Sequence, residues 1–197
     1  VFSSFLSAQW GWGADDAVVE VDNGAMNYSN GWITATGIGG ISHQAYNTGM
    51  ARGMAVRAAK VDAMRNLLET VMALQITSKT VVRGAAVEND VINSKVVAMV
   101  KGARIRDING DGVGNTSDFR YLNDESIEIE MKIHMSGISE VVLPQAGYAE
   151  APQAGSAPPS AATSAPTSGS TTGLIIDARG IGTRPAMSPK IVDQNGG

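Results

Sequence analysis

"MARGMAVRAAKVDAMRNLLETVMALQI", residues 50–76, is the stretch that decides the fold, because its apolar side chains return every three or four residues. The repeat is made by Val56, Ala59, Ala63, Leu67, Val71 and Leu74. Arg52, Arg57, Lys60, Arg65 and Glu69 fall largely off that stripe. One apolar face and one charged face at this spacing predict a long amphipathic helix that covers a core on one side only.

The core that this helix covers is predicted to be a sheet. "WITATGIG", residues 32–39, and "SIEIEMKIHM", residues 126–135, both alternate with a period of two, which indicates strands. In the second segment one face carries Ile127, Ile129, Met131, Ile133 and Met135, and the other carries Glu128, Glu130, Lys132 and His134. A sheet with one packed and one wet face is typical of antiparallel pairing. We therefore expect Leu67, Val71, Ile129 and Ile133 in one buried cluster, with Glu128 and Lys132 outside it.

Three shorter segments complete the predicted domain. Residues 77–82 and 103–107 are interpreted as strands, and residues 88–100 as a second helix that ends before Gly102. The order β-α-β-α-β-β predicts an α+β fold, with a mostly antiparallel sheet and two helices on one face.

Composition divides the chain into four parts. Residues 1–30 show no helical period and are interpreted as an N-terminal arm, and residues 31–148 as the α+β core domain. Residues 149–172 are rich in Ala, Pro, Ser and Thr and predict a linker. Residues 173–197 regain apolar side chains and are interpreted as a C-terminal tail with a strand-like "LIIDA".

Charge and cysteine content narrow the function classes. The 197 residues carry a formal charge of −4 and no long basic patch, so nucleic acid is not an expected partner. The absence of cysteine excludes disulfides and thiolate metal sites. No apolar run reaches the roughly 20 residues of a transmembrane helix. The first residues, without an initiator Met, are interpreted as a mature N-terminus left by signal-peptide removal, which predicts a secreted, extracellular or cell-surface protein.

"DINGDGVGNTSD", residues 107–118, is the most distinctive polar motif in the chain. Oxygen-bearing residues fall at loop positions 1, 3, 5, 9 and 12, with a glycine at position 6, and this is the spacing of calcium loops. The predicted ligands of Ca²⁺ are Asp107, Asn109, Asp111, the carbonyl of Val113, Asn115 and Asp118. The alternative interpretation is an Asx-rich hairpin loop, since Asp, Asn and Gly dominate turns.

No set of residues in the sequence assembles a convincing active site, and we do not expect an enzyme. The two histidines, His43 and His134, lack a Ser or Asp partner at useful spacing. Glu128 and Glu130 share a strand face and resemble paired glycosidase carboxylates, but a solvated face or a strip of salt bridges between subunits is the favoured interpretation. "GIGG" at 37–40 and "RGIG" at 179–182 do not complete a phosphate-binding motif and are interpreted as turn or bulge glycines.

Aromatic and apolar side chains near the two ends predict self-assembly. Four of the ten aromatic residues lie in the first twelve positions, outside the predicted core. Exposed aromatic residues favour aggregation unless a groove receives them. The predicted assembly residues, which would dock on a neighbouring copy, are Phe2, Phe5, Trp10, Trp12, Leu174, Ile175 and Ile176. The alternative is that the arm packs on its own domain.

The helix "ARGMAVRAAKVDAMRNLLETVMALQITSKTVV" (51–82) and the "VKGARIRDI" segment (100–108) resemble the FlgP-like family of bacterial envelope proteins. The C-terminal segment 173–193 also resembles tails of such exported proteins. The resemblance implies a small α+β domain in rings or basal disks around the flagellar motor rather than a catalyst. The chain differs from lipidated relatives because it lacks a cysteine, and from the family because loop 107–118 looks like an insertion between strands.

Together these observations favour a structural subunit of a homopolymeric assembly outside the cytoplasm, such as a filament, tube or sheet. The resemblance implies an alternative, a ring or disk component of the flagellar basal body in the bacterial envelope, with envelope or flagellar partners. A third interpretation is a monomeric periplasmic calcium-dependent binding module.

Overall fold

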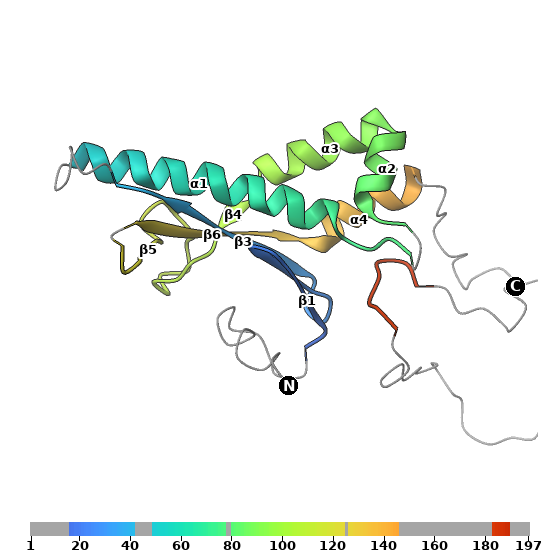
Figure 1. Cartoon of the computed structure of the whole chain (residues 1–197). Helices are drawn as coiled ribbons and strands as arrows, with labels where there is room; N and C mark the ends of the chain where they lie inside the picture. Colours follow the sequence, from blue (N-terminus) through green and yellow to red (C-terminus); the bar gives the residue numbers. More distant parts are fainter. Residues whose placement is uncertain (1–15, 42–48, 78–79, 125, 146–182, 190–197) are drawn as a thin grey trace, which may run out of the picture.

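The computed structural model describes residues 16–41, 49–77, 80–124, 126–145 and 183–189. Its strands are β1 (Val18–Val21), β2 (Gly24–Asn27), β3 (Trp32–Gly39), β4 (Arg104–Ile105), β5 (Arg120–Tyr121) and β6 (Ile127–His134). Its helices are α1 (Gly49–Met72), α2 (Val82–Glu88), α3 (Asp90–Lys101) and α4 (Met135–Gln145). Figure 1 shows α1 lying along the sheet, with α3 beside the second half of α1 and α2 beyond its far end.

The sheet runs β1-β2-β3-β6-β4, and β5 also pairs with β6. Every pairing within it is antiparallel. The central pair is β3 with β6, which are in register from Trp32 opposite His134 to Gly39 opposite Ile127. The predicted α+β class with a mostly antiparallel sheet is therefore confirmed, although the described residues contain four helices where the sequence predicted two.

Helix α1 approaches β3 so closely that side chains are excluded between them. A Cβ atom on Gly37 would lie 2.0 Å from the backbone nitrogen of Ala63, and one on Gly39 would lie 2.0 Å from the carbonyl oxygen of Ala55. These glycines lie within the strand, not in a turn or bulge as the sequence suggested. The alanines of the helix and the glycines of the strand thus form one tight contact.

Polar side chains of α1 satisfy the backbone of β3 where β2 has ended. β2 pairs with β3 only as far as Ala35. Beyond it, the side-chain amide of Asn66 donates to the carbonyl oxygen of Thr36 at 2.7 Å. Asp62 accepts from the N–H of Ile38 at 3.1 Å. The helix therefore meets the hydrogen-bonding needs of this part of the strand edge.

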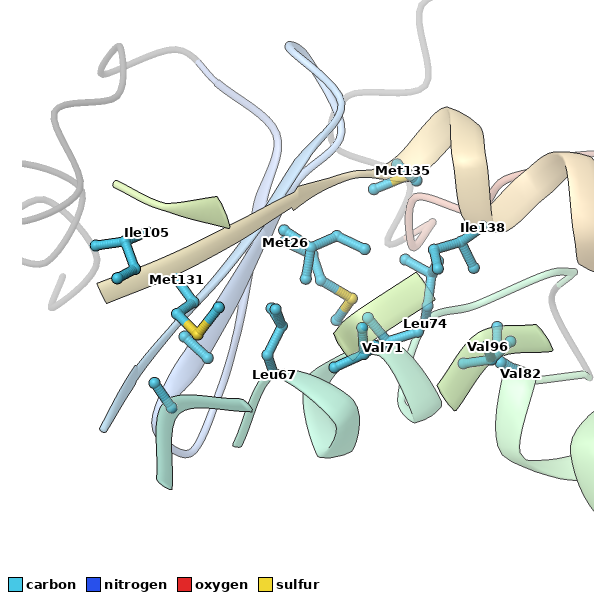
Figure 2. Packing of buried hydrophobic residues seen from close by; sticks show 14 of the residues in the cluster. Met26, Leu67, Val71, Leu74, Val82, Val96, Ile105, Met131, Met135 and Ile138 are labelled. Atoms are coloured by element: carbon cyan, nitrogen blue, oxygen red, sulfur yellow. The ribbon is translucent and has the colours of Figure 1, made fainter. Parts of the chain in front are cut away.

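The core lies between the sheet and the helices (Figure 2). Leu67, Val71 and Ile129 are fully buried in one cluster, as predicted, and Ile133 packs against that cluster while half-buried. The core prediction is confirmed for the first three residues, and the strand register is the predicted one. Helices α2, α3 and α4 extend the cluster with Val82, Val96 and Ile138.

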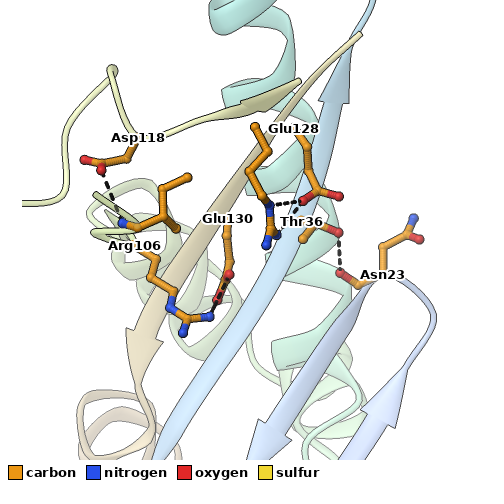
Figure 3. A network of polar contacts seen from close by, with 8 residues as sticks. Asn23, Thr36, Arg106, Asp118, Glu128 and Glu130 are labelled. Carbon is orange, nitrogen blue, oxygen red and sulfur yellow. Dashed lines mark hydrogen bonds and ion pairs between the residues drawn. The ribbon is translucent and has the colours of Figure 1, made fainter. Parts of the chain in front are cut away.

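Glu130 corrects the prediction of a wholly wet second face on β6. Its side chain is only 1% exposed, although it lies on the face opposite Ile129 and Met131. Arg106 donates from Nη1 to both carboxylate oxygens at 2.9 Å (Figure 3). Desolvation raises the pKa of Glu130, and the Arg106 guanidinium opposes that rise. Burial of this acid is thus possible because a charge partner comes with it.

Three elements differ from the sequence prediction. Residues 18–27, assigned to the arm, form the β1–β2 hairpin, whose Asp22 has φ 43°. Residues 77–82 were predicted to be a strand, but the described strand pairing there is one isolated bridge of Gln75 with Val81, beside a turn in which the N–H of Ile76 donates to the carbonyl oxygen of Thr80, and α2 begins at Val82. Residues 135–145, of which only Met135 had been assigned, form α4 directly after β6.

A short part of the predicted tail packs on its own domain. Residues 183–189 are described, and the N–H of Met187 donates to the carbonyl oxygen of Gln75 at 2.9 Å. The N–H of Ser188 donates to the carbonyl oxygen of Ile76, also at 2.9 Å. The Met187 side chain packs against the core cluster.

Candidate metal site

The acidic loop leaves and re-enters the sheet beside the same strand. It connects β4, which pairs with β6 at Lys132 and Met131, to β5, which pairs with β6 at Glu128 and Ile127. Arg106 at the start of the loop binds Glu130, and Arg120 after its end donates to Glu128 at 2.8 Å (Figure 3). Both feet of the loop are therefore held by an ion pair to β6.

Backbone amides fold the first half of the loop around Asp107. Its two carboxylate oxygens accept from the N–H groups of Gly110 at 2.6 Å and Gly112 at 2.7 Å. Both glycines have positive φ, 77° and 84°, which explains why the sequence places glycine at these two positions. Asp111 accepts from the N–H of Val113 at 2.8 Å.

Asp118 closes the loop from its other end. Its carboxylate is almost fully buried and accepts from the N–H groups of Ile108 and Asn109 at 3.2 Å and of Asn115 at 2.8 Å. The hydrogen bond from Asn115 lowers the pKa of Asp118, helped by those from Asn109 and Ile108 and opposed by burial. Asp118 is therefore an anion at neutral pH.

The folding of the loop brings three carboxylates together. Asp107, Asp111 and Asp118 each have a carboxylate oxygen within 4.8 Å of the others. Such a group could hold a metal ion, because three like charges at this distance repel one another until a cation lies between them. Each oxygen that accepts one N–H retains further acceptor capacity. Oxygen-only donors of this kind suit a hard cation such as Ca²⁺ or Mg²⁺.

The three other predicted ligands lie in the same loop and bond locally. The side-chain amide of Asn115 donates to the carbonyl oxygen of Val113 at 3.0 Å, and its oxygen accepts from the N–H of Ser117. Asn109 donates from its amide to the carbonyl oxygen of Ser117 at 3.3 Å. Their roles as ligands stay predictions.

The histidines and the predicted assembly residues were the other candidates from the sequence. His134 is exposed, meets Trp32 edge to face and is hydrogen-bonded through Nδ1 to the Oγ of Ser136 at 2.7 Å, so the expectation that it lacks a serine partner was wrong. Phe2, Phe5, Trp10, Trp12, Leu174, Ile175, Ile176 and His43 lie outside the described residues.

Sequence reasoning missed the ion pairs that position the loop. Arg106 and Arg120 flank the motif, and Glu128 and Glu130 alternate on one face of a predicted strand. The signal in the sequence was that two arginines flank the loop and two glutamates lie on the strand that follows it, in segments expected to be adjacent.

No family model matches the chain, and neither the curated proteins nor the solved structures include a significant match. The similarity to FlgP-like proteins therefore stays an expectation from the sequence. In the described part of the chain, no helix combines the length and hydrophobicity required to cross a membrane.

Proposed function

We propose that the protein is a structural subunit of a homopolymeric assembly outside the cytoplasm and that loop 107–118 stabilises it by binding Ca²⁺. The observation that carries the calcium part is the convergence of Asp107, Asp111 and Asp118 within 4.8 Å. The loop spacing favours Ca²⁺ over Mg²⁺, because up to six ligands from one flexible loop suit the larger and less regular coordination shell.

A structural role for the cation follows from where the loop is attached. Asp118 is bonded to the backbone of Ile108 and Asn109, so a cation that joins it to Asp107 and Asp111 would tie both halves of the loop together. The loop feet are held to β6, at the centre of the sheet. Binding would therefore stabilise the folded domain by linkage, by about 2.7 kcal/mol when free calcium is a hundredfold above the dissociation constant.

The assembly part rests on the aromatic arm and the apolar tail of the sequence. The helices of the domain also expose large apolar side chains, among them Met50, Met54 and Val87, which a neighbouring copy could cover. A closed ring or disk in the envelope and an open filament are two geometries of the same type of subunit.

Calorimetry and electron microscopy test the two parts separately. Thermal unfolding is measured in about 2 mM CaCl₂, in about 2 mM MgCl₂ and in EDTA, because the calcium concentration outside cells is on the order of millimolar. We expect calcium to raise the melting temperature of the wild type but not of Asp111→Ala, with Asp124→Ala as a matched acid outside the cluster. Equal melting in calcium and EDTA would refute the cation site, whereas micrographs that show only monomers at all concentrations would refute the assembly.

A further inference from the structure

The strand β2 is buried on both of its faces, whereas antiparallel sheets commonly keep one face in water. Gly24 and Met26 face α1, because a Cβ atom on Gly24 would meet Oγ1 of Thr70 and because Met26 lies in the core. Side chains alternate along a strand, so Ala25 and Asn27 lie on the other face of the sheet, which we call the outer face. Both are 0% exposed, so the outer face of β2 is covered as well.

The burial continues onto β3 at Thr34, which is paired with Ala25. Thr34 is 3% exposed, and its Oγ1 atom has no hydrogen-bond partner among the described residues. We call Ala25, Asn27 and Thr34 the outer patch. Because a buried hydroxyl without a partner is uncommon in a folded protein, the outer patch calls for a covering segment that also brings a polar group.

The large side chains beside the outer patch are directed away from it. Trp32 is turned toward β6, where Nζ of Lys132 lies 4.8 Å from its ring centroid and the ring of His134 meets it edge to face at 5.0 Å. Glu20, which is paired with Ala25 from β1, is exposed. Helix α1 packs on the opposite face of the sheet (Figure 1). We therefore expect the cover of the outer patch to come from a part of the chain outside the described residues.

The chain enters the domain at this same patch. The side-chain amide of Asn27 donates to the carboxylate of Asp16 at 2.7 Å, so residues 1–15 join the domain beside the outer patch. The described part of the C-terminal region, residues 183–189, lies on the other side of the sheet, where Met187 packs against the core cluster. The place of attachment therefore favours residues 1–15 as the cover.

We propose that residues 1–15, which we call the leading segment, fold back over the outer patch of their own domain. Residues 1–14 carry no charged side chain, so no charge is buried when they cover Ala25 and Thr34. The short side chains of the patch leave room for an aromatic ring, which contact with the sheet removes from water. The leading segment spans about 50 Å when extended, and β2 spans about 13 Å, so the segment is long enough. Its aromatic residues are Phe2, Phe5, Trp10 and Trp12.

This contact determines how the aromatic residues can serve assembly, a consequence that rests on the proposed function. A leading segment held on its own domain hides these side chains in the free chain. A neighbouring copy carries the same outer patch, so assembly through the leading segment requires its exchange between copies.

The reactivity of an introduced thiol tests the contact, because the chain has no cysteine of its own. Thr34→Cys places the thiol in the outer patch. Ile38→Cys is the matched control on the same face of the same strand, where Ile38 is 52% exposed. The rate of reaction with the thiol reagent DTNB is measured for both variants in the full chain, at protein concentrations below and above that of assembly.

The same rates are then measured after Trp10→Ala with Trp12→Ala, and after deletion of residues 1–12. Circular dichroism checks that each protein is folded. A covered thiol reacts only while its cover is open, so we expect either change to raise the rate for Thr34→Cys at least about tenfold. The rate for Ile38→Cys should stay unchanged.

The proposal is overturned if Thr34→Cys reacts as fast as Ile38→Cys in the full chain, or if neither change to the leading segment accelerates its reaction. Protection that is equal at all protein concentrations supports a leading segment folded onto its own domain. Protection that appears only in assembled protein assigns the cover to a neighbouring copy and overturns the proposal, while the proposed assembly stands. Protection in a protein that never assembles supports the contact and refutes the proposed assembly.

Discussion

Replacing Gly37 by alanine should strongly destabilise the domain, because the added methyl group has no space between β3 and α1. Its Cβ atom would lie 2.0 Å from the nitrogen of Ala63 and 2.4 Å from the carbonyl oxygen of Ala59. Ordinary contact begins at 3.4 Å, so the shorter distance falls 1.4 Å below it. Both neighbours are backbone atoms of a helix, which cannot turn aside as a side chain can.

The cost of this clash has two sources. Overpacking in a core costs about 1–3 kcal/mol. Separation of α1 from β3 would also stretch the bonds from Asn66 to Thr36 and from Ile38 to Asp62, which contribute about 0.5–1.5 kcal/mol each. The expected loss is therefore about 2–6 kcal/mol, a large fraction of the roughly 5–15 kcal/mol that stabilises a typical domain.

Urea unfolding followed by circular dichroism, with a thermal melt, measures the loss. A change of 1 kcal/mol shifts the melting temperature by roughly 2–4 °C for a chain of this size, so the variant should melt about 4–24 °C lower. Gly53→Ala is the matched control, because a Cβ atom there meets nothing within 4 Å. Within α1 this control should gain about 0.5–1 kcal/mol. A Gly37→Ala protein within 1 kcal/mol of wild type would refute the close helix–strand contact.

Two further predictions concern charges around the loop. Arg106→Ala should cost about 3–5 kcal/mol at pH 7, because it leaves the buried Glu130 carboxylate without its partner. Burial raises the folded pKa of Glu130, so its contribution to stability is present at low pH and is lost as pH rises through that pKa. The deficit of Arg106→Ala should therefore shrink at pH 4 in paired urea titrations, and a constant deficit would contradict the burial argument. The contribution of Asp118 to stability changes with pH in the opposite direction. Because the pKa of Asp118 is lowered in the folded state, its contribution is present above the ordinary pKa of about 4 and is lost in stronger acid. Asp118→Asn should flatten the fall in melting temperature below pH 4 in EDTA, and an unchanged slope would assign that fall to other groups.

The long, strongly periodic elements could be predicted from the sequence, because their patterns report which face meets the core. β3 has the predicted bounds, and α1 and α3 differ from prediction by a few residues at their ends. α3 begins at Asp90 because Asn89 accepts from the N–H groups of Val91 and Ile92, a helix cap readable in the sequence. Alternation on β6 also gave the correct register, since a slip by one residue would expose Ile129.

The elements that were missed are short or have compositions that oppose their structure. β1 and β2 have four residues each, too few for a clear period of two, although Asp22 and Asn23 between them are typical turn residues. α2 begins with a β-branched Val82, which favours strands, yet burial in the core outweighs that preference. α4 contains Gly137 and Pro144 and follows β6 without a loop, so nothing in the sequence marks its start.

The burial of Glu130 and the shape of the acidic loop have a common origin that periodicity cannot report. Alternation places Glu130 on the outer face of β6, and only the pairing of β4 with that strand brings Arg106 to it. The same pairing fixes the first foot of the loop, while the pairing of β5 fixes the second opposite Glu128. Spacing alone put oxygens at alternate positions of the loop. Their convergence depends on the two feet, Ile105 opposite Met131 and Arg120 opposite Glu128, being three residues apart along one strand. A variant that weakens either ion pair should therefore weaken cation binding without removing any ligand, since the carboxylates would no longer be held at the distance that a cation requires.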